Sequence, residues 1–133
     1  MGQPAAKAND RVTATDLHIV MVPAGPSLVP TPLPHMFSGM LDGGLAPTVK
    51  IAGSAAAVVG STATNTPPHL PQSPGIAFQM PPANKATVQL GSMTVKFAGK
   101  NAARNADIAL TCNDPADLPV GQVVAAGTVM VGG

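Results

Sequence analysis

The sequence predicts a small all-β domain with many turns. Three observations point to this class: glycine and proline together make up 29 of 133 residues, glutamate is absent, and valine is the commonest large residue. Helices favour glutamate and disfavour glycine and proline, whereas valine and threonine suit strands. The length fits a single domain over residues 1–133. With no Trp or Tyr and only three Phe, the core should be thin and built from Val, Leu, Ile, Met and Ala.

The charge pattern and the N-terminus indicate which partners and which cellular locations to expect. Net charge is +1 and the seven basic residues are scattered, which argues against nucleic acid as a partner. The N-terminus lacks the apolar segment of a secretory signal, and no run approaches the ~18 apolar residues of a membrane span. We therefore expect a protein made in the cytoplasm without a signal peptide, which leaves the cell only through a dedicated machine.

An internal repeat is the clearest feature of the chain. The segment TVKIAGSAAAVVGS, residues 48–61, matches TVKFAGKNAARNAD, residues 94–107, at an offset of 46 residues without a gap. The N-terminal PAAKAND, residues 4–10, aligns with the second half of both as a truncated third copy. Three such matches in a short chain predict one supersecondary unit used three times.

Alternating apolar residues predict the strands. Residues 17–22 form a short apolar strand, and two hairpins are expected, one turning at Gly91–Ser92 and one near Ala126–Gly127. Three proline-rich segments, residues 23–35, 66–75 and 80–84, are expected to be stiff loops, since proline stops a segment from adding to a sheet. We place no domain boundary in them.

The histidines and the single cysteine are candidate metal ligands. His18 and His69 each lie eight residues after the last residue of a repeat unit, Cys112 lies five residues after the third unit, and His35 follows a proline-rich segment like the one before His69. Three imidazoles and one thiolate complete a tetrahedral zinc shell, and a scaffold with a thin core commonly gains stability from a structural metal. The spacings match no zinc-finger rule, so the alternative is three exposed or capped histidines and a buried or reactive Cys112.

No catalytic residue stands out in the remaining sequence. The pairs Lys7 with Asp10 and Arg104 with Asp107 occupy equivalent turns and are interpreted as surface ion pairs of about 0.5 kcal/mol. Two aspartates in residues 114–117 fit turn chemistry better than paired-carboxylate catalysis. The seven methionines are expected to fill gaps in the core.

With PAAK, AAAV and NAAR in equivalent places, the chain resembles the PAAR-repeat (proline-alanine-alanine-arginine) family of contractile injection systems. The resemblance covers residues 4–133 and implies a small cone of β-hairpins with pseudo-threefold symmetry and long proline-rich loops. It implies a zinc ion near the pointed tip, held by His18, His35, His69 and Cys112. Two departures concern the arginine: the first copy has Lys7 there, and the middle copy has no basic residue.

The resemblance implies a structural, non-enzymatic role. Such a tip caps and sharpens a trimeric β-helical spike, of the valine-glycine-repeat or phage-spike kind, for puncture of target membranes. We expect one tip per spike trimer and a monomer in isolation. It would sit at the tip of a type VI secretion machine or of an extracellular phage-tail-like particle, delivered outside the cell or into target cells. We see no appended toxin segment, so we expect a bare tip.

Two other functions remain open at this point. The chain could be an adaptor that recruits separate effectors to the spike, a role compatible with the tip. It could instead be a small secreted zinc hydrolase, but such an enzyme needs an open coordination position and usually a general base. Four protein ligands would close the shell, and the chain has no glutamate.

Overall fold

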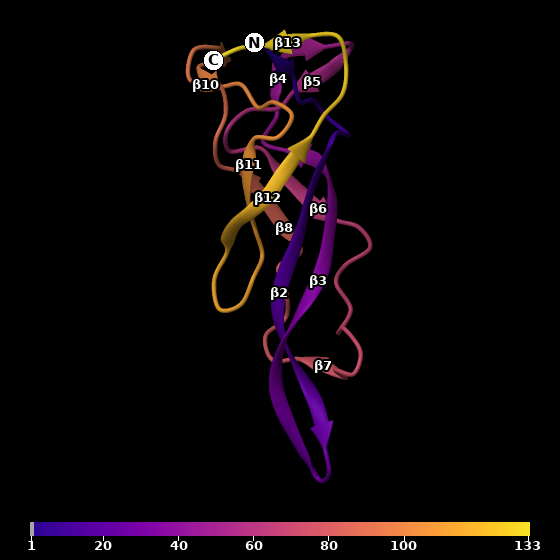
Figure 1. Ribbon diagram of the computed structural model, residues 1–133. Coiled ribbons are helices and arrows are strands. Elements are labelled where there is room, and N and C mark those ends of the chain that lie inside the picture. Colours follow the sequence, from indigo (N-terminus) through magenta and orange to yellow (C-terminus); the bar gives the residue numbers. More distant parts are fainter. Residues whose placement is uncertain (1) are drawn as a thin grey trace.

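The computed structural model describes residues 2–133, and this range contains strands, turns and loops but no helix, which confirms the all-β prediction (Figure 1). A search of the described residues for a helix long and apolar enough to cross a membrane accordingly finds none. The strands are β1 (Gln3–Pro4), β2 (Arg11–Ala24), β3 (Ser27–Gly43), β4 (Ala46–Ile51), β5 (Ser54–Ala56), β6 (Thr62–Asn65), β7 (Ala77–Phe78), β8 (Lys85–Val88), β9 (Lys96–Phe97), β10 (Lys100–Asn101), β11 (Ile108–Thr111), β12 (Leu118–Val124) and β13 (Met130–Val131).

Six antiparallel strands close into a ring. The order is β12-β11-β8-β6-β3-β2, and β12 also pairs with β2, which closes the ring. Strand β7 adds to the outer side of β2. Three two-stranded pairs, β1–β13, β4–β5 and β9–β10, lie with both chain termini beyond one end of the ring, which we call the terminal end (Figure 1).

The three repeat segments hydrogen-bond to one another in a cycle. The backbone N–H of Ala6 donates to the carbonyl of Ala103 at 2.9 Å, Ala103 donates to Ala57 at 3.0 Å, and Ala57 donates to Ala6 at 3.0 Å. All three alanines are fully buried. Each segment leads into one antiparallel pair of the ring: β2–β3, β6–β8 and β11–β12. Only alanine or glycine lets three backbones approach this closely, which explains the small residues at these positions.

The end of each repeat segment is a capped turn. The side chains of Asp10, Ser61 and Asp107 each accept the backbone N–H three residues earlier, at 3.0, 2.9 and 2.7 Å. The expected ion pairs are present, at 3.1 Å between Lys7 and Asp10 and at 3.0 Å between Arg104 and Asp107. The serine hydroxyl accepts the same hydrogen bond as the two carboxylates, although it forms no ion pair. The hydrogen bond is therefore the interaction common to all three turns, and the ion pair is not required for the turn.

The core is thin, as predicted, but its composition differs from the prediction. One buried cluster fills the ring, with Phe37 and Leu41 as its largest side chains, and a second one, around Ile51, Val58 and Val131, lies under the terminal end. The expectation that methionines fill the core is wrong for the described residues: none of their methionines is fully buried, and Met36 and Met93 are 74% and 78% exposed.

Both predicted hairpins near the C-terminus are wrong. The strand β8 does not fold back at Gly91–Ser92 but pairs with β6 and β11. The chain does not fold back at Ala126–Gly127 either, because β12 lies in the ring while β13 pairs with β1. The segment TVMV, residues 128–131, therefore pairs with residues 3–4 of the N-terminal copy. In the other two copies the equivalent partner strands are TVKI and TVKF. Closure of the ring and of the N-terminal copy outweighs local turn propensity.

The prediction of a loop over residues 23–35 is also wrong, because most of this segment belongs to β3. Strands β2 and β3 pair without a break from Arg11–Met40 to Ala24–Ser27. The hairpin extends well beyond the ring and ends at Gly25, at the opposite end of the molecule from the termini (Figure 1). Its prolines are compatible with a strand because they lie on an edge, where their missing N–H faces away from the partner strand. Residues 66–75 and 80–84 are outside the strands, as predicted.

Candidate metal centre

The interior of the ring changes from apolar to polar toward the hairpin. On β2 the inward-facing residues are Val12, Asp16, His18 and Val20, which alternate with more exposed residues as a strand requires. Neighbouring strands and loops contribute further side chains beside Asp16 and His18. The buried polar residues of this region are Asp16, His18, His35, Asn65, His69, Thr111 and Asn113, with the thiol of Cys112 among them.

Four of these residues form a group that could hold a metal ion. The possible ligand atoms of Asp16, His18, His69 and Cys112 all lie within 4.8 Å of one another, and all four residues are buried. His69 Nε2 lies 3.0 Å from Asp16 Oδ2, and Cys112 Sγ lies 3.5 Å from Asp16 Oδ2 and 3.6 Å from His18 Nε2. Zinc bond lengths in a tetrahedral site give ligand–ligand separations of about 3.4 Å, so the donor atoms already have a suitable spacing. We call these residues the metal-site cluster.

The carboxylate of Asp16 is the negative centre of the cluster. Its side chain is fully buried and accepts a hydrogen bond from Thr111 Oγ1 at 2.5 Å, with Asn113 Nδ2 at 3.5 Å. No lysine or arginine of the described chain forms an ion pair with it. A buried carboxylate is costly unless a cation or several donors compensate it. A divalent ion would balance the charges of this carboxylate and of a Cys112 thiolate.

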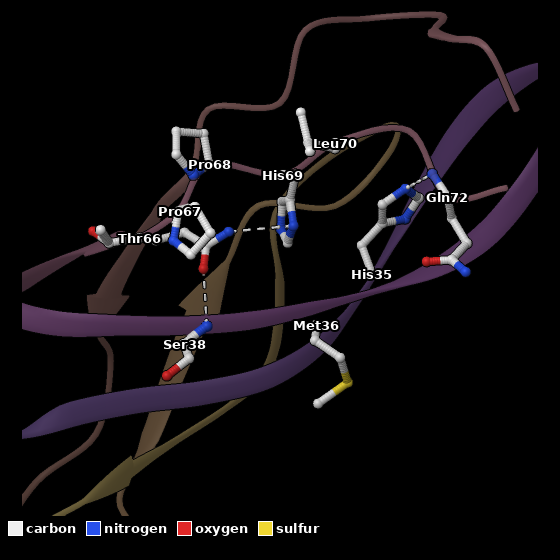
Figure 2. A pocket seen from close by; sticks show the side chains of 10 residues that line it. His35, Met36, Ser38, Thr66, Pro67, Pro68, His69, Leu70 and Gln72 are labelled. Atoms are coloured by element: carbon white, nitrogen blue, oxygen red, sulfur yellow. Dashed lines mark hydrogen bonds between the residues drawn. The ribbon is translucent and has the colours of Figure 1, made fainter.

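Hydrogen bonds define which nitrogen of His69 carries a proton. Asn65 Oδ1 accepts the N–H of Ser38 at 2.9 Å, so its Nδ2 donates to His69 Nδ1 at 3.2 Å (Figure 2). The proton of His69 is then on Nε2, where it is donated to Asp16. An ion bound at Nε2 would require this proton to move to Nδ1 and the Asn65 amide to turn.

Burial shifts the protonation of the other two members of the metal-site cluster. Desolvation lowers the pKa of His18, so its ring is neutral at neutral pH. Burial, with the charge of Asp16 as a second cause, raises the pKa of the Cys112 thiol to about 11. The thiol is therefore protonated at neutral pH, and an ion that binds its sulfur must displace that proton.

His18 has an outer partner in Asp114. Its Nδ1 is buried without a hydrogen bond, and Asp114 Oδ2 lies 3.6 Å away. The same Oδ2 accepts the N–H of Ile19 at 2.8 Å, which holds the carboxylate in place. A small shift would let Nδ1–H donate to Asp114, and this is the usual arrangement behind a metal-bound histidine.

His35 is near the metal-site cluster but is engaged elsewhere. Its ring centroid lies 5.4 Å from that of His18 and 5.6 Å from that of His69. Its Nδ1–H donates to the carbonyl of Leu33 at 2.8 Å, and its Nε2 accepts the N–H of Gln72 at 3.0 Å (Figure 2). Neither nitrogen has a free lone pair. Of the four ligands predicted from the sequence, the structure therefore brings His18, His69 and Cys112 together, with Asp16 in place of His35.

A pocket of about 370 Å³ opens beside the cluster. Its lining includes the buried residues His35, Asn65 and His69 and the exposed residues Pro67, Leu70 and Gln72. Both histidines are less than one tenth exposed.

Neither Asp16 as a ligand nor a role for Asp114 at this site was predicted from the sequence. Asp16 lies two residues before His18 in an alternating segment, so both side chains point to the same side of the strand. That periodicity was a usable signal. Asp114 gave no comparable signal, because it reaches His18 only through the packing of the loop after β11 against β2.

Comparisons with protein-family models, with curated proteins and with solved structures find no match to this chain.

Proposed function

We propose that this protein is the structural tip of a contractile injection system, seated on the end of a trimeric spike. The observation that carries the proposal is the cycle of backbone hydrogen bonds among Ala6, Ala57 and Ala103. Three equivalent segments inside one chain imitate a threefold axis, so one tip can face three identical spike subunits. The cone shape and the PAAR-repeat resemblance belong to the same proposal.

The terminal end is the surface that we assign to the spike. It carries the three short pairs β1–β13, β4–β5 and β9–β10, one from each copy. An apolar contact with few charges would suit a stable interface. Lys50, Lys96 and Lys100 are exposed on these strands, however, so the matching face of the spike should be acidic.

The metal-site cluster supports a structural role for the bound ion. Nitrogen, sulfur and oxygen donors in a buried group suit zinc. The ion would tie β2 to the loop after β6 and to the end of β11, which are far apart in sequence. Such cross-links add to the folding free energy, because the unfolded chain cannot hold the ion in the same way.

A hydrolytic role receives no support from the geometry. Four buried protein donors would leave no coordination position for water, and the described chain has no glutamate to act as a base. Purified protein should show no zinc-dependent turnover of peptide, ester or glycan substrates. Turnover that His69→Ala abolishes would replace the structural assignment with an enzymatic one.

Native mass spectrometry of the tip with a trimeric β-helical spike tests the proposed function. We expect a monomer alone and one copy per trimer in the complex, because a homotrimer would need a further interface. The complex should weaken with rising salt if the lysines of the terminal end contribute. A 3:3 assembly, or a stable homotrimer of the isolated tip, would contradict the symmetry argument.

A further inference from the structure

The outer half of the β2–β3 hairpin is unlike the rest of the molecule in its chemistry. From Ile19 to Pro34 there is no charged or ionisable side chain, although these 16 residues are largely solvent-exposed. The neighbouring segment, residues 70–83, which includes β7, has none either. We call the two segments together the hairpin end.

Apolar side chains cover this uncharged surface. Leu28 and Val29 are 48% and 45% exposed beside the turn, and Ile76, in the adjoining loop, is 62% exposed. Leu70 and Met80 add further exposed apolar surface at 78% and 45%. A single exposed side chain of this kind is common, but here Leu28 and Val29 lie on the projecting hairpin, and the other three lie in the uncharged segment that pairs with it through β7.

The register of the hairpin shows which way its backbone N–H groups point. Leu17 and Ile19 pair with Pro34 and Pro32. The N–H groups of Leu17 and Ile19 donate outside the hairpin, to Asn113 at 2.6 Å and to Asp114 at 2.8 Å. These pairs are therefore the non-hydrogen-bonded type, in which both N–H positions face away from the partner strand.

The prolines of β3 occupy those outward positions in succession. Pro30, Pro32 and Pro34 alternate along the strand and oppose Met21, Ile19 and Leu17. Proline has no N–H, so the outer edge of β3 from residue 29 to residue 35 has no backbone donor. On β2, Pro23 has the same orientation opposite Leu28, so it removes another donor near the turn.

An exposed apolar surface without charges and without backbone donors suits contact with lipid better than contact with protein. An edge without donors cannot accept an added strand, which removes the usual mode of peptide binding by a sheet edge. Charges and backbone donors without a partner are costly in a bilayer. The hairpin end has no charge, and its prolines remove the backbone donors from the outer edge of β3. Exposed Leu, Val, Ile and Met supply the apolar area that favours transfer out of water.

We propose that the hairpin end inserts its apolar turn into the interfacial layer of a phospholipid bilayer. The insertion is driven by apolar transfer and needs no anionic lipid, no spike and no contraction. It shares the target membrane with the proposed function, but it can be tested on the isolated monomer. Failure to bind a spike and failure to bind a vesicle are therefore separate results.

The chain has no tryptophan, so Leu28→Trp supplies a single fluorescent reporter at the turn. Vesicles of zwitterionic phosphatidylcholine, with and without bromine on the acyl chains, are the probe. We expect the emission of the Leu28→Trp variant to shift to the blue with vesicles and to be quenched by the brominated lipid. An unchanged emission maximum with no quenching overturns the proposal.

Two valines of similar exposure give a matched pair for the unlabelled protein. Val29 is 45% exposed near the turn, and Val124 is 49% exposed on β12, away from it. In vesicle flotation, Val29→Lys should lower the partition coefficient about tenfold, because one apolar contact is lost, and Val124→Lys should leave it unchanged. Circular dichroism shows that each variant is folded before comparison.

Three outcomes of the flotation experiment would overturn the proposal. Equal loss in Val29→Lys and Val124→Lys would mean that adsorption is nonspecific. Binding only to anionic vesicles would assign it to the exposed lysines of the terminal end. Self-association without lipid that Val29→Lys abolishes would make a second copy of the chain the partner of the hairpin end.

Discussion

At the scale of single residues, the main question is which side chains would hold a metal ion. The resemblance implies His18, His35, His69 and Cys112, whereas the distances group Asp16 with the other three and leave His35 bonded to Leu33 and Gln72. Both sets contain one thiol and at least two imidazoles, so composition does not separate them. They differ in charge: with a thiolate, the Asp16 set neutralises a divalent ion and the His35 set leaves one positive charge.

Ligand substitutions distinguish the two sets. We expect about one zinc per chain in protein purified without chelator, as a four-ligand site binds one ion. Asp16→Asn should lower zinc content more than His35→Ala, and Cys112→Ser should abolish it together with its stabilisation against heat. Elemental analysis and thermal melting give both readings, with Met40→Ala as an exposed control. Retention of zinc by Asp16→Asn with loss in His35→Ala would establish the set implied by the resemblance.

The same residues predict how the metal-free protein responds to pH. Burial lowers the pKa of His18 and His35 from 6.5. Below pH 6.5 the unfolded chain therefore binds more protons than the folded chain, and the stability of the fold decreases as the pH decreases. Burial raises the pKa of Cys112 from 9.0 to about 11, so stability falls again as pH rises above 9.

Urea unfolding of chelator-treated protein checks this pH dependence. Stability attributable to these groups should be greatest between pH 6.5 and 9. Cys112→Ser should remove the alkaline fall and keep the acid one, because serine does not ionise in this range. A Cys112→Ser profile that still falls above pH 9 would assign the alkaline effect to another group.

At the scale of elements, the long hairpin depends on where its prolines lie. A proline is tolerated in a strand only at an edge, with its nitrogen turned away from the partner. Pro30, Pro32 and Pro34 meet this condition through their pairing with Met21, Ile19 and Leu17. The segment is therefore a strand despite a composition that suggests a loop, and its free edge is protected against pairing with other chains.

Restoring the backbone donors should make this edge associate. We expect the double substitution Pro30→Ala and Pro32→Ala to increase self-association at high protein concentration, because two outward N–H groups become available for strand pairing. Sedimentation velocity over a concentration series measures the effect. Pro81→Ala, in an exposed loop, is the control. A double variant that stays monomeric would show that the prolines do not protect the edge.

At the scale of the whole molecule, three alanines determine how closely the copies approach. Ala6, Ala57 and Ala103 are fully buried, belong to one core cluster and are joined by backbone hydrogen bonds. Because all three are fully buried, we expect a larger side chain at any of them to displace a neighbouring copy. The repeat therefore couples local packing to the closure of the ring.

Enlarging one of these alanines should weaken the whole fold. Ala103→Leu should destabilise the protein by about 1–3 kcal/mol, the usual cost of overpacking, with a lower melting temperature and no selective loss of one strand pair. Ala116→Leu, at an exposed position, should be close to neutral. Calorimetry decides the point, and equal melting temperatures for the two variants would place free space at the centre of the cycle.

Local composition and periodicity predicted the all-β class, the ion pairs of Lys7 with Asp10 and Arg104 with Asp107, and the histidines and cysteine as candidate ligands. These features depend on neighbours in sequence, such as Asp10 with Lys7, or on alternation within one strand, as in residues 17–22. Only the tertiary structure decided that β8 joins the ring instead of folding back at Gly91–Ser92, and that residues 128–131 complete the N-terminal copy. It also decided that Asp16 joins the metal-site cluster while His35 bonds to Gln72. The physical reason is the same in each case. Burial and hydrogen bonding between segments far apart in sequence outweigh the conformational preferences of local turns, which amount to about a fraction of a kcal/mol.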